Sequence, residues 1–406
     1  MNILYVTQFY PPENIAGAFR AADHSRIWQE NGSKITIFTG YPNYPKGKIF
    51  DGYHPELLSE ELVKGVRVLR SKLIAKPNTS LLKRVINGSS FLFYGVLNSF
   101  LNANKIGTNF DVVLASSGTI FAGSLGYVLA KRYKIPFVIE FRDLTYVQMM
   151  ATGSSVASKK VRLIKSLELF LANKATAVIT LTNGFKKELI TQGLTEKRIE
   201  VIPNGAELKP CRCLSQTNQI TLGYFGTLGI SQDIERTLEL AKHITSVADD
   251  VRYRIIGDGA KKMSIKALIK EEYSEIATYF DGMPQAELET YYEDTDFTFV
   301  SLVKNPAFSD TIPSKIFQSF ARGVPVIFSG PTGEASEIVE VSGAGIVLVG
   351  TSSDDDRKLK TFFSNSNWKD ERNEMSIKAR AFIEKNYSRE KLAEKMLSFL
   401  ERNIGK

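Results

Sequence analysis

The chain has 406 residues, of which 43% are hydrophobic and 24% charged, a composition typical of folded chains with two or three domains and not of disordered or fibrous proteins. The net charge of +8 is uneven, since residues 1–205 hold 26 lysines and arginines against 14 acidic residues and the remainder holds 26 against 30. We therefore expect the first half to bind something acidic. The two cysteines, Cys211 and Cys213, are too few for a disulfide framework or a four-ligand zinc site and indicate a reducing compartment.

The beginning of the chain, "MNILYVTQFYPPE", lacks the basic start of a signal peptide and is typical of a first buried strand. The most apolar run, residues 91–101, is too short to span a bilayer. We expect no transmembrane segment.

Short runs rich in valine and isoleucine then alternate with longer helical segments, the pattern of a parallel sheet covered by helices on both faces. The first set of runs lies at residues 3–8, 34–40, 66–71, 111–117, 136–141, 176–182 and 199–205. The second set lies at residues 220–226, 253–259, 277–282, 297–302 and 324–328, with a shorter run at 344–349. Each set is sufficient for one doubly wound α/β domain.

Residues 203–219 separate the two sets, have little periodicity and contain two prolines, which indicates a linker. The sequence thus predicts a first domain over 1–205 and a second over 206–387. A last helix is expected over 388–406, where Ser388 can cap it and Leu392, Met396 and Leu400 recur every four residues. This helix needs a surface to cover and can cross back to the first domain.

Three turns that follow expected strands carry glycines where a phosphate can approach the backbone. The first runs from Thr7 to Arg20 and contains Gly17, but it is not a dinucleotide-binding G-x-G-x-x-G turn and can be a plain proline-rich connection. The others contain Gly226, Thr227 and Gly229, and Gly257 and Gly259. The last of these turns either contacts a nucleotide or is a simple loop at the sheet edge.

The segment "FSDTIPSKIFQSFARGVPVIFSG", residues 308–330, predicts a loop, a short helix and a strand. Pro313 and Gly323 suit the start and the end of that helix. Four polar residues surround the helix start, where free amides and the helix dipole favour an anion such as a phosphate: Asp310, Ser314, Lys315 and Gln318. The alternative is a charged rim without a ligand.

Between residues 71 and 105, lysines and arginines are interleaved with leucines and aromatic residues. A helix of this composition can lie in the headgroup layer of an anionic membrane. The same apolar residues can instead pack on the sheet as an ordinary domain helix.

Together, the first loop with Pro11, Pro12 and Glu13, "VIPNGAE" (201–207), "FGTLG" (225–229), "IIGDG" (255–259) and "SDTIPSKIFQSFARGVPVI" (309–327) resemble the retaining GT-B glycosyltransferases of family four. The Pro-Ser-Lys-x-Phe motif and the loop over 40–53 are similar to the bacterial subgroup that builds capsule and O-antigen units, including N-acetylfucosaminyl transferases. The resemblance implies an α/β fold of two Rossmann-like doubly wound domains that face a central cleft. It also implies transfer of a hexosyl or N-acetylhexosaminyl group with retention, without a metal or other cofactor.

The resemblance further implies the partners and the place of work. The second domain would bind a nucleotide-sugar donor, with UDP as the expected nucleotide, and the first would bind a polyprenyl-diphosphate-linked glycan acceptor. The enzyme would lie in the cytoplasm, on the inner face of the bacterial cell membrane, with no nucleic acid as partner.

Site residues follow from the same resemblance. Asp310, Arg142 and Asp143 are assigned to catalysis, and donor binding is assigned to Gly17, Gly226, Thr227, Gly229, Gly257, Gly259, Ser314, Lys315 and Gln318. Three positions depart from the family pattern. The glutamate pair falls on Asp310 and Gln318; Arg142 and Asp143 stand where many members have a histidine; and the basic pair after "FGTLG" is missing.

These departures motivate a second hypothesis, a non-catalytic subunit that binds a sugar nucleotide within a polysaccharide assembly complex. A sugar-nucleotide epimerase is disfavoured because such enzymes rely on carboxylate and histidine acid-base groups. Nucleic-acid binding is disfavoured because no binding module is present and the positive charge is interleaved with apolar residues. The Asp294/Asp296 pair and the Asp354–Asp356 run are expected to be structural.

Overall fold

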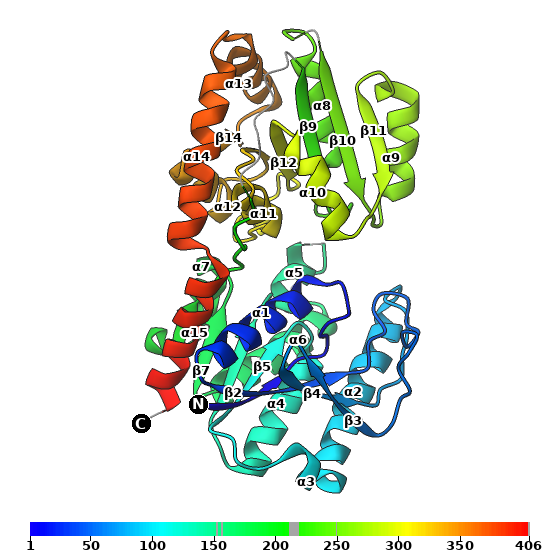
Figure 1. Ribbon diagram of the computed structural model, residues 1–406, viewed down its shortest axis with the longest axis vertical. Helices are drawn as coiled ribbons and strands as arrows, with labels where there is room; N and C mark the ends of the chain where they lie inside the picture. Colours follow the sequence, from blue (N-terminus) through cyan, green and yellow to red (C-terminus); the bar gives the residue numbers. More distant parts are fainter. Residues whose placement is uncertain (152, 156, 211–218, 249, 405–406) are drawn as a thin grey trace. The chain divides into compact units, whose positions relative to one another are not determined.

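The computed structural model describes residues 1–151, 153–155, 157–210, 219–248 and 250–404, so Cys211, Cys213 and the rest of residues 211–218 of the expected linker lie outside the described residues. The chain folds into two compact units, unit 1 with Met1–Pro203 and Arg389–Lys406 and unit 2 with Asn204–Ser388. Figure 1 shows the elements of each unit. No helix in the described ranges is both long enough and apolar enough to cross a membrane.

Unit 1 is built on an eight-stranded sheet with the order β3-β4-β2-β1-β5-β6-β7-β8, parallel except for β3. Its strands are β1 (Asn2–Val6), β2 (Lys34–Gly40), β3 (Leu58–Val63), β4 (Val66–Ser71), β5 (Val112–Ser117), β6 (Phe137–Phe141), β7 (Ala177–Thr180) and β8 (Ile199–Val201). Its helices are α1 (Ala16–Glu30), α2 (Leu81–Leu101), α3 (Ala103–Ile106), α4 (Ile120–Tyr133), α5 (Thr145–Ala151), α6 (Lys159–Lys174), α7 (Asn183–Thr191), the 3-10 turn η1 (Glu196–Arg198) and α15 (Arg389–Ile404).

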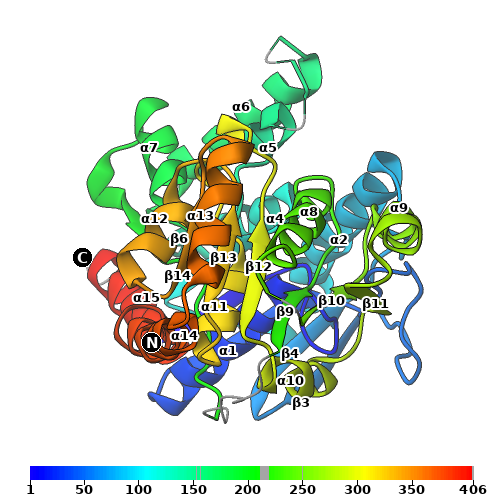
Figure 2. The same ribbon diagram turned by 90° about the horizontal axis from the view of Figure 1, so that it is seen from above.

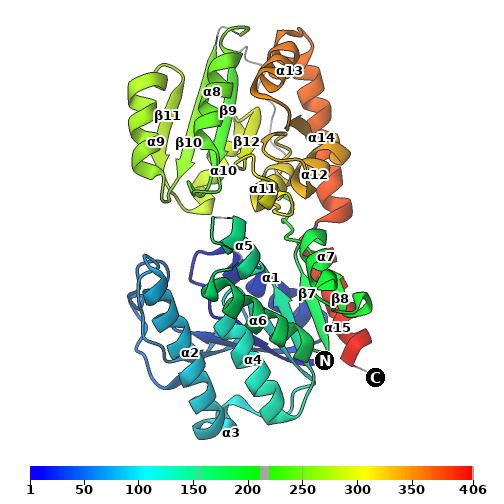
Figure 3. The same cartoon turned by 180° about the vertical axis from the view of Figure 1, so that it is seen from behind.

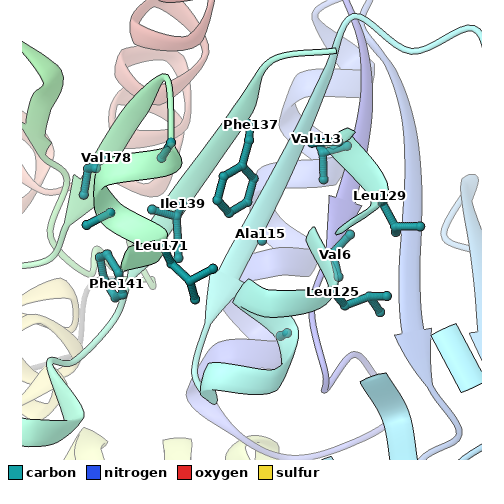
Figure 4. Packing of buried hydrophobic residues seen from close by; sticks show 14 of the residues in the cluster. Val6, Val113, Ala115, Leu125, Leu129, Phe137, Ile139, Phe141, Leu171 and Val178 are labelled. Carbon is teal, nitrogen blue, oxygen red and sulfur yellow. The ribbon is translucent and has the colours of Figure 1, made fainter. Parts of the chain in front are cut away.

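Alternate residues of the central strands face opposite sides of this sheet, which gives unit 1 two cores. Leu4 and Val6 of β1 face a cluster that is completed by α2, α4 and α6, and Figure 4 shows part of this packing around Val113, Phe137 and Ile139. Ile3 and Tyr5 face a second cluster that is completed by α1 and α15. Both faces of the sheet are therefore covered, as the continuous apolar runs predict.

The expectation of a fully parallel sheet is wrong at one edge, where β3 pairs antiparallel with β4. The two strands form a hairpin through Lys64 and Gly65, both at positive φ (49° and 81°), a geometry typical of tight hairpin turns. The segment "LSEELV" was not predicted as a strand because it contains two glutamates and lacks the Val- and Ile-rich run of a buried strand. In the structure Glu60 is exposed and Glu61 is half-buried.

Unit 2 is built on a six-stranded, fully parallel sheet with the order β11-β10-β9-β12-β13-β14, which can be followed in Figure 2. Its strands are β9 (Ile220–Phe225), β10 (Val251–Gly257), β11 (Ala277–Asp281), β12 (Phe297–Ser301), β13 (Val326–Ser329) and β14 (Gly345–Leu348). Its helices are α8 (Ile234–Ile244), α9 (Lys262–Leu268), the π turn η2 (Ile269–Tyr273), α10 (Gln285–Glu293), the 3-10 turn η3 (Pro306–Phe308), α11 (Ser314–Ala321), α12 (Glu334–Ser342), α13 (Ser352–Ser364) and α14 (Trp368–Asn386). Every predicted strand run of both sets holds a strand, and the prediction of two doubly wound α/β domains is confirmed.

Helix α1 holds the segment through which the chain passes from unit 1 to unit 2, residues Ile202 and Pro203. The Arg20 guanidinium forms a buried ion pair with Glu140 (2.8 Å) and donates to the carbonyls of Ile202 and Pro203 (2.8 and 2.7 Å). The returning helix α15 is held on the same helix, since the Trp28 indole N–H donates to the Ala393 carbonyl (2.7 Å). Helix α15 is therefore a part of the unit 1 core.

Candidate functional site

In each sheet the chain reverses its winding direction at one pair of strands, β1/β5 in unit 1 and β9/β12 in unit 2. Open α/β sheets bind their ligands outside the carboxyl ends of the strands at such a reversal. In unit 2 the loops that follow β9 and β12 are joined there, because the Val303 amide donates to the Ser231 carbonyl (2.9 Å). Of the donor-binding residues predicted in unit 2, Gly257 is the last residue of β10 and Gln318 lies in the second turn of α11, and the others lie in loops or at the start of α11.

Lys315, in the first turn of α11, lies over the loop that follows β9. Its ammonium donates to the Tyr224 hydroxyl (2.5 Å) and the Thr227 carbonyl (3.3 Å) and lies 3.9 Å from the centre of the Tyr224 ring. A Cβ added to Gly226, whose φ is +130°, would stand 2.6 Å from the Lys315 Cε. The glycine thus leaves the space that the lysine stem occupies.

Burial lowers the pKa of Lys315 from its usual 10.5 to about 7, because the ammonium is desolvated and has no carboxylate among its described contacts. Tyr224 was not predicted as a site residue. Its hydroxyl also donates to the Thr227 carbonyl (2.7 Å), so it holds both the lysine and the loop. A binding anion would supply the counter-charge that this lysine lacks.

The other glycines of unit 2 allow close packing of the same loops. A Cβ on Gly257 would stand 1.8 Å from the Gly226 carbonyl oxygen, and one on Gly259 would stand 2.4 Å from the Leu228 carbonyl oxygen. The Gly229 amide donates to the Gln232 side chain (3.0 Å). Gly257 and Gly259 therefore have a structural reason to be glycine, whatever ligand binds nearby.

Asp310, Ser314 and Gln318 surround the start of α11 as predicted from the sequence. Asp310 is exposed in the preceding loop, Ser314 is the first helical residue, and Gln318 lies one turn further on and is partly exposed. The N-cap residue Pro313 provides no side-chain cap, so this helix start can receive an external anion. Close by in the sheet, at the end of β12, the buried Ser301 hydroxyl has no hydrogen-bond partner among the described residues.

In unit 1, Arg142 and Gly17 are brought together at the carboxyl edge. A Cβ on Gly17, near the start of α1, would stand 1.8 Å from the Arg142 Nη1, and one on Gly118, just before α4, would stand 3.3 Å from it. The guanidinium thus lies between the amino-terminal ends of two helices, and its buried Nε has no partner in the described part of the chain. A guanidinium beside two helix starts is suited to an anion.

Asp143 is the neighbour of this arginine and reaches solvent. Partial desolvation of its carboxyl raises the pKa of Asp143 to about 6, against the opposing effect of the Arg142 charge. A carboxyl with such a pKa can accept a hydrogen bond when ionised and donate one when protonated near neutral pH.

Glu13, a fully buried carboxyl of the first loop, was missed as a functional candidate. It accepts hydrogen bonds from the amides of Tyr10 (3.3 Å), Asn43 and Tyr44 (both 2.9 Å) and so joins the loops after β1 and β2. Burial outweighs these bonds and raises the pKa of Glu13 to about 7. The Pro-Pro-Glu motif was visible in the sequence, but two of the three amides that Glu13 binds lie about thirty residues away along the chain.

A chain of side-chain hydrogen bonds continues along this edge. The Thr119 hydroxyl donates to Gln8 (2.5 Å), the Gln8 amide to Asn87 (2.8 Å), and the Asn87 amide to Asn43 (2.7 Å). It crosses the β1/β5 reversal and joins the loops after β1, β2 and β5 to α2. The edge of unit 1 is therefore preorganised.

The paired acidic residues of unit 2 are structural, as predicted. Arg254 holds Asp294, and Arg372 pairs with Asp296, which also accepts from the Thr221 amide (2.8 Å). Within the described ranges, no group of three or more histidine, cysteine or acidic side chains is arranged to hold a metal ion.

Comparison with protein families gives two adjacent matches. Residues 18–205 match the glycosyl transferase 4-like domain, and residues 212–382 match glycosyl transferases group 1. A search of curated protein sequences gives no significant match.

Several solved structures share the fold over the whole chain. Sucrose-phosphate synthase from Thermosynechococcus elongatus is 15% identical with a TM-score of 0.73, covering 100% of this chain and 99% of that one. Anabaena HepE in complex with UDP is 14% identical with a TM-score of 0.68, covering 99% and 100%. The lipopolysaccharide outer core galactosyltransferase WaaB is 13% identical with a TM-score of 0.62, covering 98% and 99%.

Proposed function

Because this chain belongs to the GT-B glycosyltransferases, with a glycosyl transferase 4-like domain followed by a group 1 domain, we propose that it transfers a sugar from a UDP-linked donor to a polyprenyl-diphosphate-linked glycan, with retention, at the inner face of the bacterial cell membrane. The observation that carries the donor assignment is Lys315, desolvated over Gly226 beside an uncapped helix start. HepE was solved with UDP and with UDP-glucose, which supports a nucleotide-sugar donor. The name of WaaB supports an acceptor of the bacterial surface glycan class.

In this proposal the donor diphosphate binds to unit 2. The Lys315 ammonium and the first amides of α11 contact its oxygens, and Gly226 lets the loop backbone approach without a Cβ in the way. Gln318 hydrogen-bonds the ribose hydroxyls, and Asp310, in the loop before the helix, faces the donor sugar. As the sugar departs, charge develops on the leaving phosphate, and a fixed cation at that oxygen lowers the barrier.

Unit 1 provides the acceptor side of the proposal. Arg142, between the starts of α1 and α4, contacts an anionic group, and Asp143 orients the attacking hydroxyl. No enzymic nucleophile is required, since the hydroxyl attacks from the side of the departing phosphate, which takes its proton. Positioning of the two reactants is then the main task of the protein.

The second candidate is a non-catalytic subunit that binds a sugar nucleotide, and it is motivated by Asp310 and Gln318 in place of the family's two glutamates. The test incubates the protein with a panel of nucleotide sugars and membrane lipid extract and measures nucleotide release. Nucleotide binding by calorimetry, combined with no donor consumption on any acceptor, would support the second candidate.

Two variants test the site. Lys315→Ala and Asp310→Ala should abolish transfer while the thermal unfolding curve stays that of a folded protein. Lys270→Ala, which removes an exposed lysine of the same unit, is the matched control and should retain full activity. Full activity of both site variants would refute the assignment of the donor site.

A further inference from the structure

Helix α2 has its apolar and polar faces reversed relative to an ordinary surface helix. The residues that it buries are mostly small or polar: Asn87, Gly88, Ser90, Phe91, Gly95, Asn98 and Ser99. On the opposite side Leu82, Phe93 and Phe100 are 69%, 63% and 59% exposed. The helix therefore packs on the sheet and also presents an apolar face outward.

Small residues on the inner side of α2 allow this arrangement. A Cβ on Gly88 would stand 2.1 Å from the Phe121 ring, and one on Gly95 would stand 2.5 Å from Leu125, so α4 packs directly against the α2 backbone. The outward side instead has a shallow apolar hollow of about 420 Å³, lined by Ser89, Leu92, Phe93, Val96, Leu97 and Phe100.

Helix α6 carries a second exposed apolar stripe. Leu163, Leu167 and Phe170 follow the helical spacing and are 60%, 39% and 45% exposed. The Phe170 ring lies 5.5 Å from that of Tyr127 on α4, so this stripe borders α4 just as α2 does. Figure 3 shows α2, α4 and α6 together over one face of the first sheet.

The charge of these three helices is almost entirely positive. They carry nine cations: Lys83, Arg84, Lys131, Arg132, Lys159, Lys160, Arg162, Lys165 and Lys174. Their one acidic residue, Glu168, is buried and caps the amides of Thr145 and Tyr146. By contrast α1 and α15, on the other face of the same sheet, hold six basic and five acidic residues.

None of the nine cations forms an ion pair with another described residue. Arg132 instead lies 3.8 Å above the Phe100 ring, and Lys174 lies 5.7 Å from the Phe170 ring. At these two positions the charged end of the side chain lies beside an exposed aromatic ring. Positive charge next to exposed apolar side chains is the arrangement of proteins that bind at an anionic lipid interface.

We propose that the outer faces of α2, α4 and α6, called here the basic apolar surface, dock unit 1 on an anionic lipid bilayer. The exposed apolar residues of α2, such as Phe93, and of α6, such as Leu163, would enter the boundary of the acyl chains while the nine cations contact the headgroups. The proposal rests on the proposed function in that a lipid-linked acceptor lies in such a bilayer. A protein partner is disfavoured because it would need an unusually acidic surface to match three helices without one exposed acidic side chain.

The test measures co-sedimentation of the full chain with vesicles of phosphatidylcholine alone and of phosphatidylcholine with phosphatidylglycerol. Wild type should bind the anionic vesicles, bind neutral ones at least about tenfold more weakly, and dissociate as salt is added. Phe93→Asp and Leu163→Asp should each weaken binding at least about tenfold. Lys159→Gln combined with Lys160→Gln should weaken it by roughly 25-fold, from about fivefold for each cation lost.

Matched controls lie in unit 2. Ile377→Asp changes an apolar residue that is 71% exposed on α14, and Lys270→Glu reverses an exposed lysine; both should bind vesicles as wild type does. The proposal is overturned if wild type does not bind the anionic vesicles, or if the controls weaken binding as much as the surface variants do.

A separate measurement distinguishes failure of the docking proposal from failure of the proposed function. With a detergent-dispersed acceptor, the surface variants should transfer sugar at the wild-type rate and bind UDP with unchanged affinity. Vesicle binding without transfer to any acceptor would refute the proposed function alone, and transfer in detergent without vesicle binding would refute the docking alone.

Discussion

The substitution Gly226→Ala tests how the donor site of unit 2 is built. The new methyl group would stand 2.6 Å from the Lys315 Cε and 3.5 Å from its Nζ. Since the lysine stem is the flexible partner, it has to move, and its ammonium then leaves the Tyr224 hydroxyl and the Thr227 carbonyl. A charge-assisted hydrogen bond contributes about 1.5–3 kcal/mol, so UDP binding should weaken roughly 10- to 150-fold.

Backbone strain is a second effect of this substitution and has to be separated from the first. Gly226 has a φ of +130°, where a side chain costs about 1–3 kcal/mol of folding free energy. Gly193→Ala is the matched control, because Gly193 also has a positive φ (+95°) but no atom lies within 4 Å of the added Cβ. It should lower the free energy of unfolding in urea by a similar amount and leave UDP affinity unchanged.

Calorimetric titration with UDP in a double-mutant cycle completes the test. If Gly226→Ala acts by displacing the lysine, it should change UDP affinity little in a Lys315→Ala background, because the two effects are coupled. An undiminished effect in that background would show that the glycine acts on the ligand without the lysine. Wild-type affinity in the single variant would refute the described geometry.

Three further predictions concern charged groups. Burial lowers the Lys315 pKa from 10.5 to about 7, so the positive charge is lost as pH rises through 7. UDP affinity should therefore fall between about pH 6 and about pH 8, and more steeply in wild type than in Lys315→Arg. Calorimetry at both pH values measures this difference. Burial raises the Glu13 pKa from 4.5 to about 7, so between these pH values the folded chain holds a proton that the unfolded chain has lost. The free energy of unfolding should therefore fall as pH rises from about 4.5 to about 7. Glu13→Gln should make the free energy of unfolding, measured in urea, depend less on pH in that range. Arg372→Met removes the arginine that neutralises the buried Asp296 carboxylate and should lower the free energy of unfolding by about 3–5 kcal/mol, a loss that added Asp296→Asn should partly restore.

The sequence was sufficient for the sheets because buried parallel strands have a local signature. Runs such as "KITIFTG" are rich in β-branched residues, and all of this run except its first residue, Lys34, is buried in the structure. Strand β3 lacks this signature, since half of it faces solvent, and its pairing depends on a hairpin turn at Lys64 and Gly65. Whether such a segment forms an edge strand depends on its tertiary contacts and not on its own sequence alone.

The candidate site was predictable where the signal was local and not elsewhere. Lys315 could be found because a helix start lies within a few residues of it. Tyr224 could not, because an aromatic residue in a buried strand has the appearance of core, and its hydroxyl meets Lys315 across 91 positions of sequence. Glu13 is similar, because the amides of Asn43 and Tyr44 become its neighbours only after the loops of β1 and β2 have packed together.

The membership of α15 in the unit 1 core affects the order in which the chain can fold during translation. Leu392, Met396 and Leu400 pack in the same cluster as Trp28 and Ile3, although all of unit 2 is synthesised between them. Unit 2, by contrast, is one continuous segment, and domains generally fold as units while the chain emerges from the ribosome. Unit 1 is therefore completed only after unit 2 has been synthesised, and the side of α1 that α15 covers stays uncovered until α15 has left the ribosome.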